Sequence, residues 1–336
     1  MMNNTLYIVL PCYNEQEVLP ETASRLTEKL GSLLGREKIS AASQIVFVND
    51  GSADDTWQII RQLCLTSTFI RGINLSRNRG HQNALLAGLM TVMDEADMVV
   101  SMDADLQDDI AAIDVMVDKY LAGIDIVYGV RNDRRKDSFF KKMSAEAFYR
   151  FMNVMGAGTV FNHADYRLMS KRALEGLAEF NEVNLFLRGI VPLIGYSSDT
   201  VLYERGERFA GESKYPLAKM ISFAIEGITS LSTRPLRLIT LLGFVIFIIS
   251  LVMLIYALIS FFVGVTIPGW TTMMLSIWAI GGLIILSLGI VGEYIGKIYM
   301  ETKGRPRFII EEYLKNPASA MDNEKQINDD KITDVI

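Results

Sequence analysis

The chain has 336 residues, of which 50% are hydrophobic, and a formal net charge of −6 at pH 7. The negative charge argues against a partner that is nucleic acid. Two cysteines are too few for a disulfide framework, so the class of small disulfide-stapled domains is excluded and a reduced, cytosolic environment is the default.

The first 130 residues alternate short apolar runs with amphipathic stretches. The expected strands are 6–10, 44–48, 69–75, 98–102 and 124–128, and the expected helices are about 15–34, 55–64, 80–94 and 110–122. The strands are continuous apolar runs, which is typical of a parallel sheet covered on both faces. We therefore predict an α/β fold with a doubly wound, mostly parallel sheet.

Two later stretches mix aromatic and basic residues. They cover 138–155 and 215–233, and both patterns suit amphipathic helices lying in a membrane interface. Ordinary helices that face the core of a soluble domain remain the alternative.

Two long apolar stretches follow at 238–263 and about 271–292. Each is long enough to cross a bilayer, which takes about 20 residues. The segment between them is short and uncharged, whereas basic residues precede the first stretch and follow the second. The positive-inside rule therefore predicts a transmembrane hairpin with both flanks in the cytoplasm.

These patterns divide the chain into four parts. We expect a cytoplasmic catalytic domain at 1–214, an interfacial region at 215–235, two transmembrane helices within 236–296, and a cytoplasmic tail at 297–336. The tail is polar and acidic after about residue 316, which predicts disorder there.

Polar side chains follow several of the predicted strands. Asp103 and Asp105 come just after a strand, and two carboxylates at this spacing can share Mg²⁺ or Mn²⁺. Alone the pattern is weak, because many such pairs are solvated turn residues. Asp50 precedes Gly51 at another strand end, where its carboxylate could bind a base or ribose or simply form an Asx turn. The carboxyl ends of such a sheet are where ligands bind.

Several motifs together carry a family resemblance. In chain order they are PCYNE at 11–15, VNDGS at 48–52, LSRNRG at 75–80, DADLQD at 103–108, DYRLM at 165–169, RFAGESKY at 208–215 and GEYIGK at 292–297. The chain resembles inverting family 2 glycosyltransferases with the GT-A fold. Within them it is similar to polyprenyl-phosphate glycosyltransferases, namely the bactoprenol glucosyltransferases of O-antigen and lipopolysaccharide modification and, more distantly, dolichol-phosphate mannose synthase. The resemblance covers about residues 6 to 313.

The resemblance implies roles for particular residues. Those that would hold the nucleotide-sugar are Pro11, Tyr13, Asn14, Glu15, Asp50, Asp103 and Gln107. Asp103 and Asp105 would also bind the Mg²⁺ or Mn²⁺ cofactor.

The resemblance also implies catalytic and phosphate-binding residues. Asp165, Asp105 and Arg167 would act in catalysis, Asp165 lying near the sugar and acceptor. The basic residues that would lie near the phosphates are Arg131, Arg167, Arg208 and Lys214. His163 departs from the expected pattern; it could touch the sugar, and packing in its loop is the favoured interpretation.

The resemblance therefore implies an enzyme of the bacterial inner membrane. It would move a sugar, with glucose from UDP-glucose the leading candidate, onto undecaprenyl phosphate, and inversion would give a β-linked product from an α-linked donor. Galactose, N-acetylhexosamines, aminoarabinose and mannose remain open as the sugar. The expected partners are the nucleotide-sugar donor, the polyprenyl phosphate acceptor, the lipid bilayer, further copies of the chain, a flippase and a downstream periplasmic glycosyltransferase.

Three other functions compete with this one. A non-catalytic, membrane-anchored protein that binds nucleotide-sugars stays open as the alternative. Such a protein would be expected to have lost its pair of metal-binding carboxylates, but Asp103 and Asp105 are both present. A processive polysaccharide synthase is disfavoured because the chain has no Q-x-x-R-W motif and only two predicted spans. A transporter is disfavoured because those spans carry no charge.

Overall fold

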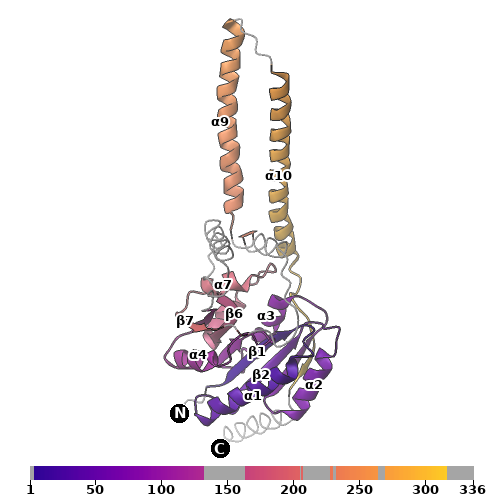
Figure 1. The fold of residues 1–336 in the computed structure, drawn as a ribbon, viewed down its shortest axis with the longest axis vertical. Helices are drawn as coiled ribbons and strands as arrows, with labels where there is room; N and C mark the ends of the chain where they lie inside the picture. The colour runs from indigo at the N-terminus through magenta and orange to yellow at the C-terminus, as the bar shows by residue number, and fades with distance from the viewer. Residues whose placement is uncertain are drawn as a thin grey trace, which may run out of the picture. The chain divides into compact units, whose positions relative to one another are not determined.

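The computed structural model describes residues 4–131, 163–204, 206, 228–229, 232–263 and 269–315. The chain divides into two compact units, one of residues 1–144, 159–214 and 306–336, and the other of residues 145–158 and 215–305. We call the first the catalytic unit and the second the hairpin unit, and Figure 1 shows the elements of each. The predicted amphipathic stretch at 138–155 and most of that at 215–233 lie outside the described residues.

The catalytic unit contains an eight-stranded sheet with the order β7-β5-β6-β4-β1-β2-β3-β8. The strands are β1 (Leu6–Cys12), β2 (Gln44–Asn49), β3 (Ile70–Leu75), β4 (Met98–Ser101), β5 (Ile126–Arg131), β6 (His163–Ser170), β7 (Ser198–Tyr203) and β8 (Ile310–Leu314). The helices are α1 (Leu19–Gly35), α2 (Thr56–Thr66), α3 (His81–Val92), α4 (Ala112–Leu121), α6 (Lys171–Ala178) and α7 (Leu187–Leu193).

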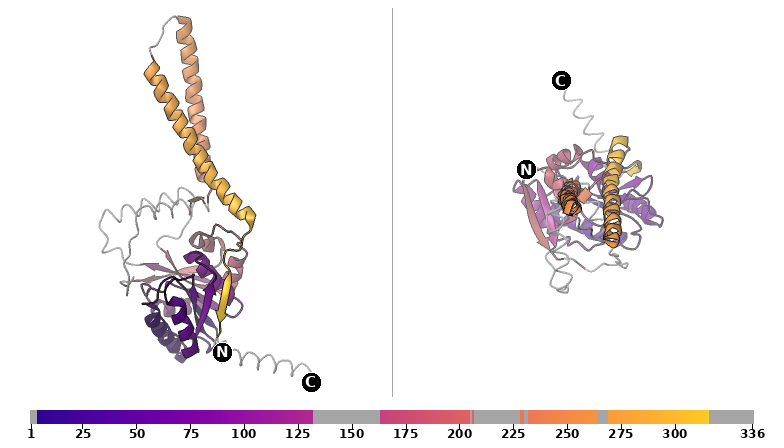
Figure 2. Two further views of the ribbon diagram at one scale, coloured as in Figure 1. Left: turned by 90° about the vertical axis from the view of Figure 1, so that its right-hand side faces the viewer. Right: turned by 90° about the horizontal axis from the view of Figure 1, so that it is seen from above.

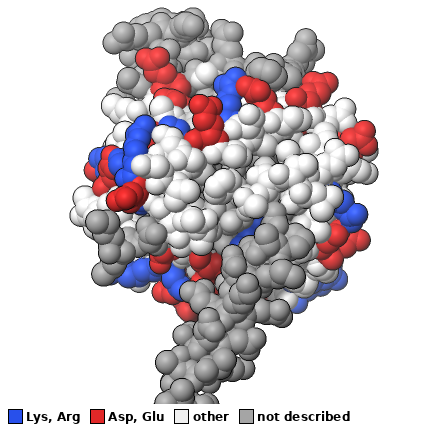
Figure 3. Space-filling model, turned by 90° about the horizontal axis from the view of Figure 1, so that it is seen from below, with Lys and Arg blue, Asp and Glu red and all other residues white. Residues whose placement is uncertain are grey.

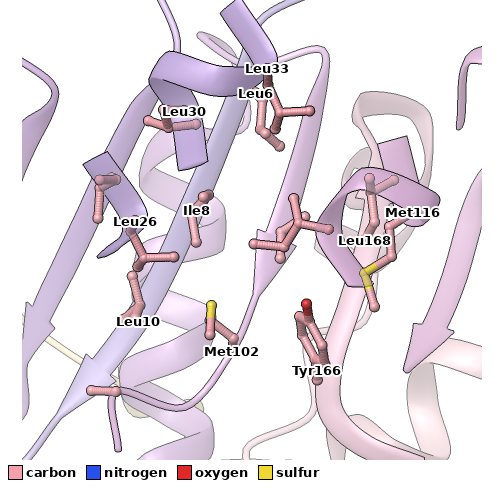
Figure 4. Packing of buried hydrophobic residues seen from close by; sticks show 14 of the residues in the cluster. Leu6, Ile8, Leu10, Leu26, Leu30, Leu33, Met102, Met116, Tyr166 and Leu168 are labelled. Atoms are coloured by element: carbon pink, nitrogen blue, oxygen red, sulfur yellow. The ribbon is translucent and has the colours of Figure 1, made fainter. Parts of the chain in front are cut away.

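Helices cover both faces of the sheet, and the buried residues of its central strands alternate between two clusters. Leu6, Ile8 and Leu10 of β1 join the cluster that contains α1, α2 and α4, and Figure 4 shows them beside the leucines of α1. Tyr7 and Val9 join the other cluster, which contains α3, α6 and α7. The continuous apolar runs in the sequence are thus explained by burial on both faces.

The predicted α/β fold is confirmed, and its mostly parallel sheet contains two antiparallel strands, β6 and β8. β1 pairs in parallel with β2 and β4, β2 with β3, and β5 with β7. However, β6 lies between β4 and β5 and is antiparallel to both. β6 contains the motif at 165–169 but was not predicted as a strand, and it sets the position of Asp165.

The edge strand β8 comes from the far end of the chain and is antiparallel to β3. Side chains reinforce this pairing: Arg71 Nη1 donates a hydrogen bond to Tyr313 Oη at 3.0 Å, and Asn74 Nδ2 donates one to Glu311 at 2.9 Å. The segment that we predicted as part of a separate tail at 297–336 therefore contributes to the catalytic sheet. The physical reason is that its backbone pairs with a sheet edge that would otherwise expose unpaired N–H and C=O groups, while Ile310, Tyr313 and Leu314 pack against the apolar clusters.

Removal of β8 is expected to destabilise the catalytic unit. A truncation after Gly304 deletes the strand and leaves the buried Arg71 without Tyr313, so we expect the melting temperature to fall by at least roughly 5 °C. A truncation after Lys315 keeps every β8 contact and is the matched control. Thermal unfolding of the two purified proteins in detergent checks this, and equal melting temperatures would contradict it.

The hairpin unit contains two long apolar helices, α9 (Arg234–Val263) and α10 (Trp270–Lys303). They run in opposite directions in Figures 1 and 2. Both are long and apolar enough to cross a membrane, within Arg234–Met253 and Ser276–Lys303, and neither window is buried. The predicted hairpin is present, and α10 continues past the expected end of its span by about three turns.

The surface of the catalytic unit carries both signs of charge. On the face drawn in Figure 3, acidic and basic side chains are interspersed among uncharged residues. Some charged side chains of the catalytic unit form ion pairs at its surface, such as Arg25 with Glu21 at 2.7 Å. Pairs this exposed contribute little to stability, so the fold rests on the two apolar clusters.

Candidate active site

The triplet of residues 103–105 lies directly beyond the end of β4. Thr22 Oγ1 of α1 donates a hydrogen bond to the backbone oxygen of Ala104 at 2.8 Å, which fixes the triplet against the helix. Asp105 is buried and accepts a hydrogen bond from the backbone N–H of Gln107 at 3.1 Å. The Asp103 side chain is 39% exposed. The carboxylate of Asp105 is thus held within the loop, whereas that of Asp103 is accessible to a ligand.

Asp165 lies close to this triplet because β6 is antiparallel to β4. Ser101, the last residue of β4, stands opposite Arg167, so the start of β6 meets the end of β4. Ser101 Oγ also donates a hydrogen bond to the backbone oxygen of Asp165 at 2.6 Å. Two segments separated by about 60 residues therefore bring their carboxylates to one edge of the sheet.

Asp165 is buried and has two arginine partners. Arg167 Nη2 lies 2.7 Å from Asp165 Oδ1, and Arg188 Nη2 of α7 lies 3.0 Å from Asp165 Oδ2. Burial by itself would raise the pKa of Asp165, but its cationic neighbours outweigh burial and hold the pKa well below the usual range. Such a carboxylate is a weak base and keeps its negative charge.

His81, the first residue of α3, lies between the two carboxylates. Its Nε2 is 3.5 Å from Asp103 Oδ1 and 3.6 Å from Asp165 Oδ2. Burial alone would lower the pKa of His81, but these two acids outweigh burial and raise that pKa above its ordinary value. The histidine is therefore an electrostatic partner of both acids.

Asp50, predicted to hold the nucleotide, binds a neighbouring loop. Its Oδ1 accepts a hydrogen bond from the backbone N–H of Arg79 at 2.6 Å, and its Oδ2 accepts one from Gly80 at 2.9 Å. Asp50 is 2% exposed, and burial raises the pKa of its carboxyl despite these bonds. In this structure Asp50 fixes the turn that precedes α3.

The other residues predicted to bind the nucleotide follow the end of β1. Pro11 is buried in the strand, whereas Tyr13 is 49% exposed. Asn14 has a positive φ of 55°, and its Oδ1 accepts a hydrogen bond from the backbone N–H of Ala53 at 2.9 Å. The backbone N–H of Glu15 donates to Thr56 Oγ1 at 2.9 Å. These contacts hold the ends of β1 and β2 together and leave the Tyr13 ring accessible.

Asp108 belongs to a buried network beside the triplet. Tyr203 Oη donates a hydrogen bond to Asp108 Oδ1 at 2.5 Å, and Arg131 Nε donates one to Tyr203 Oη at 3.1 Å. Asp108 Oδ2 has no partner among the described residues. Burial, with a smaller contribution from Asp103, raises the pKa of Asp108 to about 6. Arg131, predicted to lie near phosphates, is thus joined to the loop that carries the triplet.

The raised pKa of Asp108 predicts a pH-dependent effect on stability. Because its folded pKa lies above the unfolded value near 3.9, ionising Asp108 costs stability as the pH rises from about 4 to about 6. Asp108→Asn removes that cost, so the melting temperature of the variant relative to the parent should rise across this interval, by an amount equivalent to roughly 3 kcal/mol. Thermal unfolding at pH 4 to 8 measures it, and a constant difference would contradict the assignment.

The donor set suits a hard divalent cation that also binds a diphosphate. Asp103 and Asp105 offer carboxylate oxygens, which Mg²⁺ and Mn²⁺ prefer, and such ions usually complete their coordination with substrate phosphates. In the part of the chain that the structure describes, no group of three His, Cys, Asp or Glu side chains could hold a metal ion by itself. Arg208 and Lys214, together with the side chain of His163, lie outside the described residues.

Sequence reasoning missed His81 and Arg188 as members of the site. Neither belongs to a polar cluster that directly follows a strand, so the rule used to find candidates did not select them. The only signal for His81 is its position immediately after the motif at 75–80. Arg188 has no such signal, because its contact with Asp165 depends on how α7 packs.

The fold and the site together define a GT-A-like glycosyltransferase that carries a C-terminal hairpin of two apolar helices. Comparison with protein families agrees: residues 7–177 match the family described as glycosyl transferase family 2, and residues 234–298 match the GtrB C-terminal hairpin. The chain therefore belongs to glycosyl transferase family 2 and is GtrB-like.

Similar proteins extend over almost the whole chain. An uncharacterized glycosyltransferase of Bacillus subtilis (strain 168), YkoT, is 51% identical over 311 residues, which are 93% of this chain and 92% of YkoT. The bactoprenol glucosyl transferase of Shigella phage SfX is 38% identical over 305 residues, which are 90% of this chain and 97% of that protein.

Solved structures show a more distant likeness, which concerns the fold alone. The mannosyltransferase PcManGT from Pyrobaculum calidifontis, solved with GDP-Man and Mn²⁺, is 17% identical, with a TM-score of 0.40, covering 89% of this chain and 86% of its own.

Proposed function

We propose that the protein transfers a sugar from a nucleotide-sugar to undecaprenyl phosphate, with inversion, at the cytoplasmic face of the membrane. Glucose from UDP-glucose is the leading donor, because relatives that cover at least 90% of the chain are named bactoprenol glucosyl transferases. The observation that carries the proposal is that Asp103 and Asp165 lie near the same residue, His81. Asp103 offers a subsite for the donor diphosphate, and Asp165 with its two arginines offers one for an anionic acceptor.

The reaction needs little from a general base. A phosphate monoester has a second pKa near ~6 and is largely dianionic at cytosolic pH, so its oxygen can attack the anomeric carbon directly. The bond from that carbon to the donor diphosphate breaks, and the nucleoside diphosphate leaves with the electron pair. Asp165, whose pKa is held low, suits a charged group that orients the sugar and its arginine neighbours.

Charge on the departing diphosphate must be compensated. A divalent cation held by Asp103 and Asp105 would supply that compensation. Arg167 is buried and already bound to Asp165, whereas the side chain of Arg188 is 35% exposed. We therefore assign Arg188 to the phosphate of the acceptor and Arg167 to holding Asp165 in place.

The hairpin supports a lipid acceptor. Segments on both sides of the hairpin, β7 before it and β8 after it, belong to one sheet, which favours both flanks lying on the same side of the membrane. Basic residues at these flanks include Arg234, Arg237, Lys303 and Arg305. This pattern favours the cytoplasmic side and attracts anionic lipid headgroups.

Membranes that contain the protein should form a labelled lipid product from undecaprenyl phosphate and one member of a panel of labelled nucleotide-sugars. The panel comprises UDP-linked glucose, galactose and N-acetylhexosamines, a nucleotide-linked aminoarabinose and GDP-mannose. Analysis of the product should show a β-linked sugar, and an α-linked product would rule out a single displacement. Nucleotide binding without transfer from any donor would support instead a non-catalytic nucleotide-sugar-binding protein.

A further inference from the structure

The imidazole of His81 contacts two acids that the proposed reaction places on opposite sides of the transferred sugar. Asp103 belongs to the donor side and Asp165 to the acceptor side, and His81 Nε2 lies 3.5 Å and 3.6 Å from their respective oxygens. These are ion-pair distances, slightly beyond those of a normal hydrogen bond. The His81 side chain is 42% exposed, so its ring is open to solvent.

The position of His81 is set by a turn that is held at several points. Gly80 has a φ of 85°, which favours glycine. Asp50 binds the N–H groups of Arg79 and Gly80, while Asn83 Nδ2 donates a hydrogen bond to the backbone oxygen of Arg79 at 2.9 Å. The backbone that leads into α3 is therefore held in place, and the His81 ring at its start lies near the two acids.

The turn after β2 packs closely against the loop that precedes α3. A Cβ atom at Gly51 would lie 2.5 Å from the backbone nitrogen of Asn78 and 2.7 Å from the backbone carbon of Arg77, so only glycine fits there. Gly51 also has a φ of 63°. The motif at 48–52 thus packs on the motif at 75–80, and their combined effect is to place His81.

We propose that His81 is a positioning residue that ties Asp103 to Asp165 and so fixes the separation between the donor and acceptor subsites. The inference rests on the proposed function for the names of the two subsites, but the contacts themselves do not depend on it. Three segments distant in sequence, the starts of α3 and β6 and the end of β4, meet at this one ring. Sugar transfer requires that donor and acceptor be held in a fixed relative geometry, and His81 is placed to supply that link.

Histidine-selective ¹⁵N NMR of the whole protein in detergent tests the contacts without any substrate. The chain has only two histidines, and a His163→Gln variant assigns the two sets of imidazole signals. We expect Asp103→Asn and Asp165→Asn each to shift the His81 signals. Asp118→Asn, which alters a 53% exposed carboxylate paired with Lys38, should leave them unchanged. Unshifted His81 signals in the Asp103→Asn variant would overturn the proposal.

Kinetics of His81 variants test the positioning role. Replacing His81 by leucine should lower kcat about 10- to 100-fold and weaken Mn²⁺–UDP binding, measured by calorimetry, by a similar factor. Because a glutamine side chain can place an N–H near the position of Nε2, His81→Gln should stay within about fivefold of the parent. Gln58→Leu, on the exposed face of α2, controls for a new surface leucine. A leucine variant that binds and turns over like Gln58→Leu would overturn the proposal.

The two proposals can fail separately. If no nucleotide-sugar supports transfer, the proposed function fails, and the NMR comparison still decides whether His81 joins the two acids. If the parent transfers sugar and the leucine variant does so equally well, His81 has no positioning role, and the proposed function stands.

Discussion

Replacing Asp103 by asparagine is expected to lower the rate of sugar transfer by about a thousandfold. Asp103 is the accessible member of the carboxylate pair beyond β4, and the change removes one negative charge from the proposed cation site. Asp105→Asn should have an effect of similar size, because it also removes one negative charge from that site, although the amide oxygen can still accept the N–H of Gln107. Initial rates with saturating donor and undecaprenyl phosphate measure both variants.

Chelation and a matched variant separate this effect from general damage. Treatment with EDTA should abolish transfer, and added Mg²⁺ or Mn²⁺ should restore it. Asp118→Asn removes a carboxylate from the exposed side of α4 and should keep full activity. If EDTA left the rate unchanged while Asp103→Asn was inactive, the carboxylate would be needed for another reason, and the cation site would be wrong.

Replacing Asp165 by asparagine is expected to affect both stability and turnover. The variant leaves Arg167, which is 2% exposed, without its anionic partner, and breaking a buried pair in this way costs about 3–5 kcal/mol. Turnover should fall about 100-fold or more, because the sugar and Arg188 lose the group that orients them. Denaturant unfolding and kcat measured on the same preparation check the two effects.

A second change distinguishes the two consequences of losing Asp165. In Asp165→Asn combined with Arg167→Met, the buried charge is removed together with its partner, so much of the stability should return. Turnover should not return with it, because the carboxylate is still absent. Recovery of both properties would mean that Asp165 serves only to neutralise Arg167 and has no role in transfer.

Local sequence patterns were sufficient to predict most strands of the sheet. The strands from β1 to β5 and the helices between them were predicted because apolar runs of strand length alternate with amphipathic stretches. β6 and β8 were missed for a different reason. β6 carries the polar or charged residues Asp165, Tyr166 and Arg167, so it lacks the continuous apolar run by which the other strands were recognised. β8 is a five-residue strand, and pairing with β3 is a long-range event that no local pattern reveals.

The candidate site shows the same division. Asp103 and Asp105 were found because they directly follow a strand, and Asp165 was found through the family resemblance. The partners of Asp165 were less accessible to sequence reasoning. Arg167 was predicted to act in catalysis and to lie near phosphates, but its ion pair with Asp165 was not predicted, and neither were the contacts of His81 and Arg188. Ion pairs between distant segments depend on how those segments pack. The charged residues can therefore be listed from the sequence, but their partners cannot.

The position of β8 also bears on how the protein is made. A ribosome synthesises a chain from its N-terminal end, so β3 is made long before β8, the strand that pairs with its outer edge. Both apolar helices of the hairpin are translated in between. During that interval the outer edge of β3 has open backbone groups, which are a site for wrong pairing. The catalytic sheet can therefore be completed only after the hairpin has been translated, which makes the finished fold a late event in biogenesis.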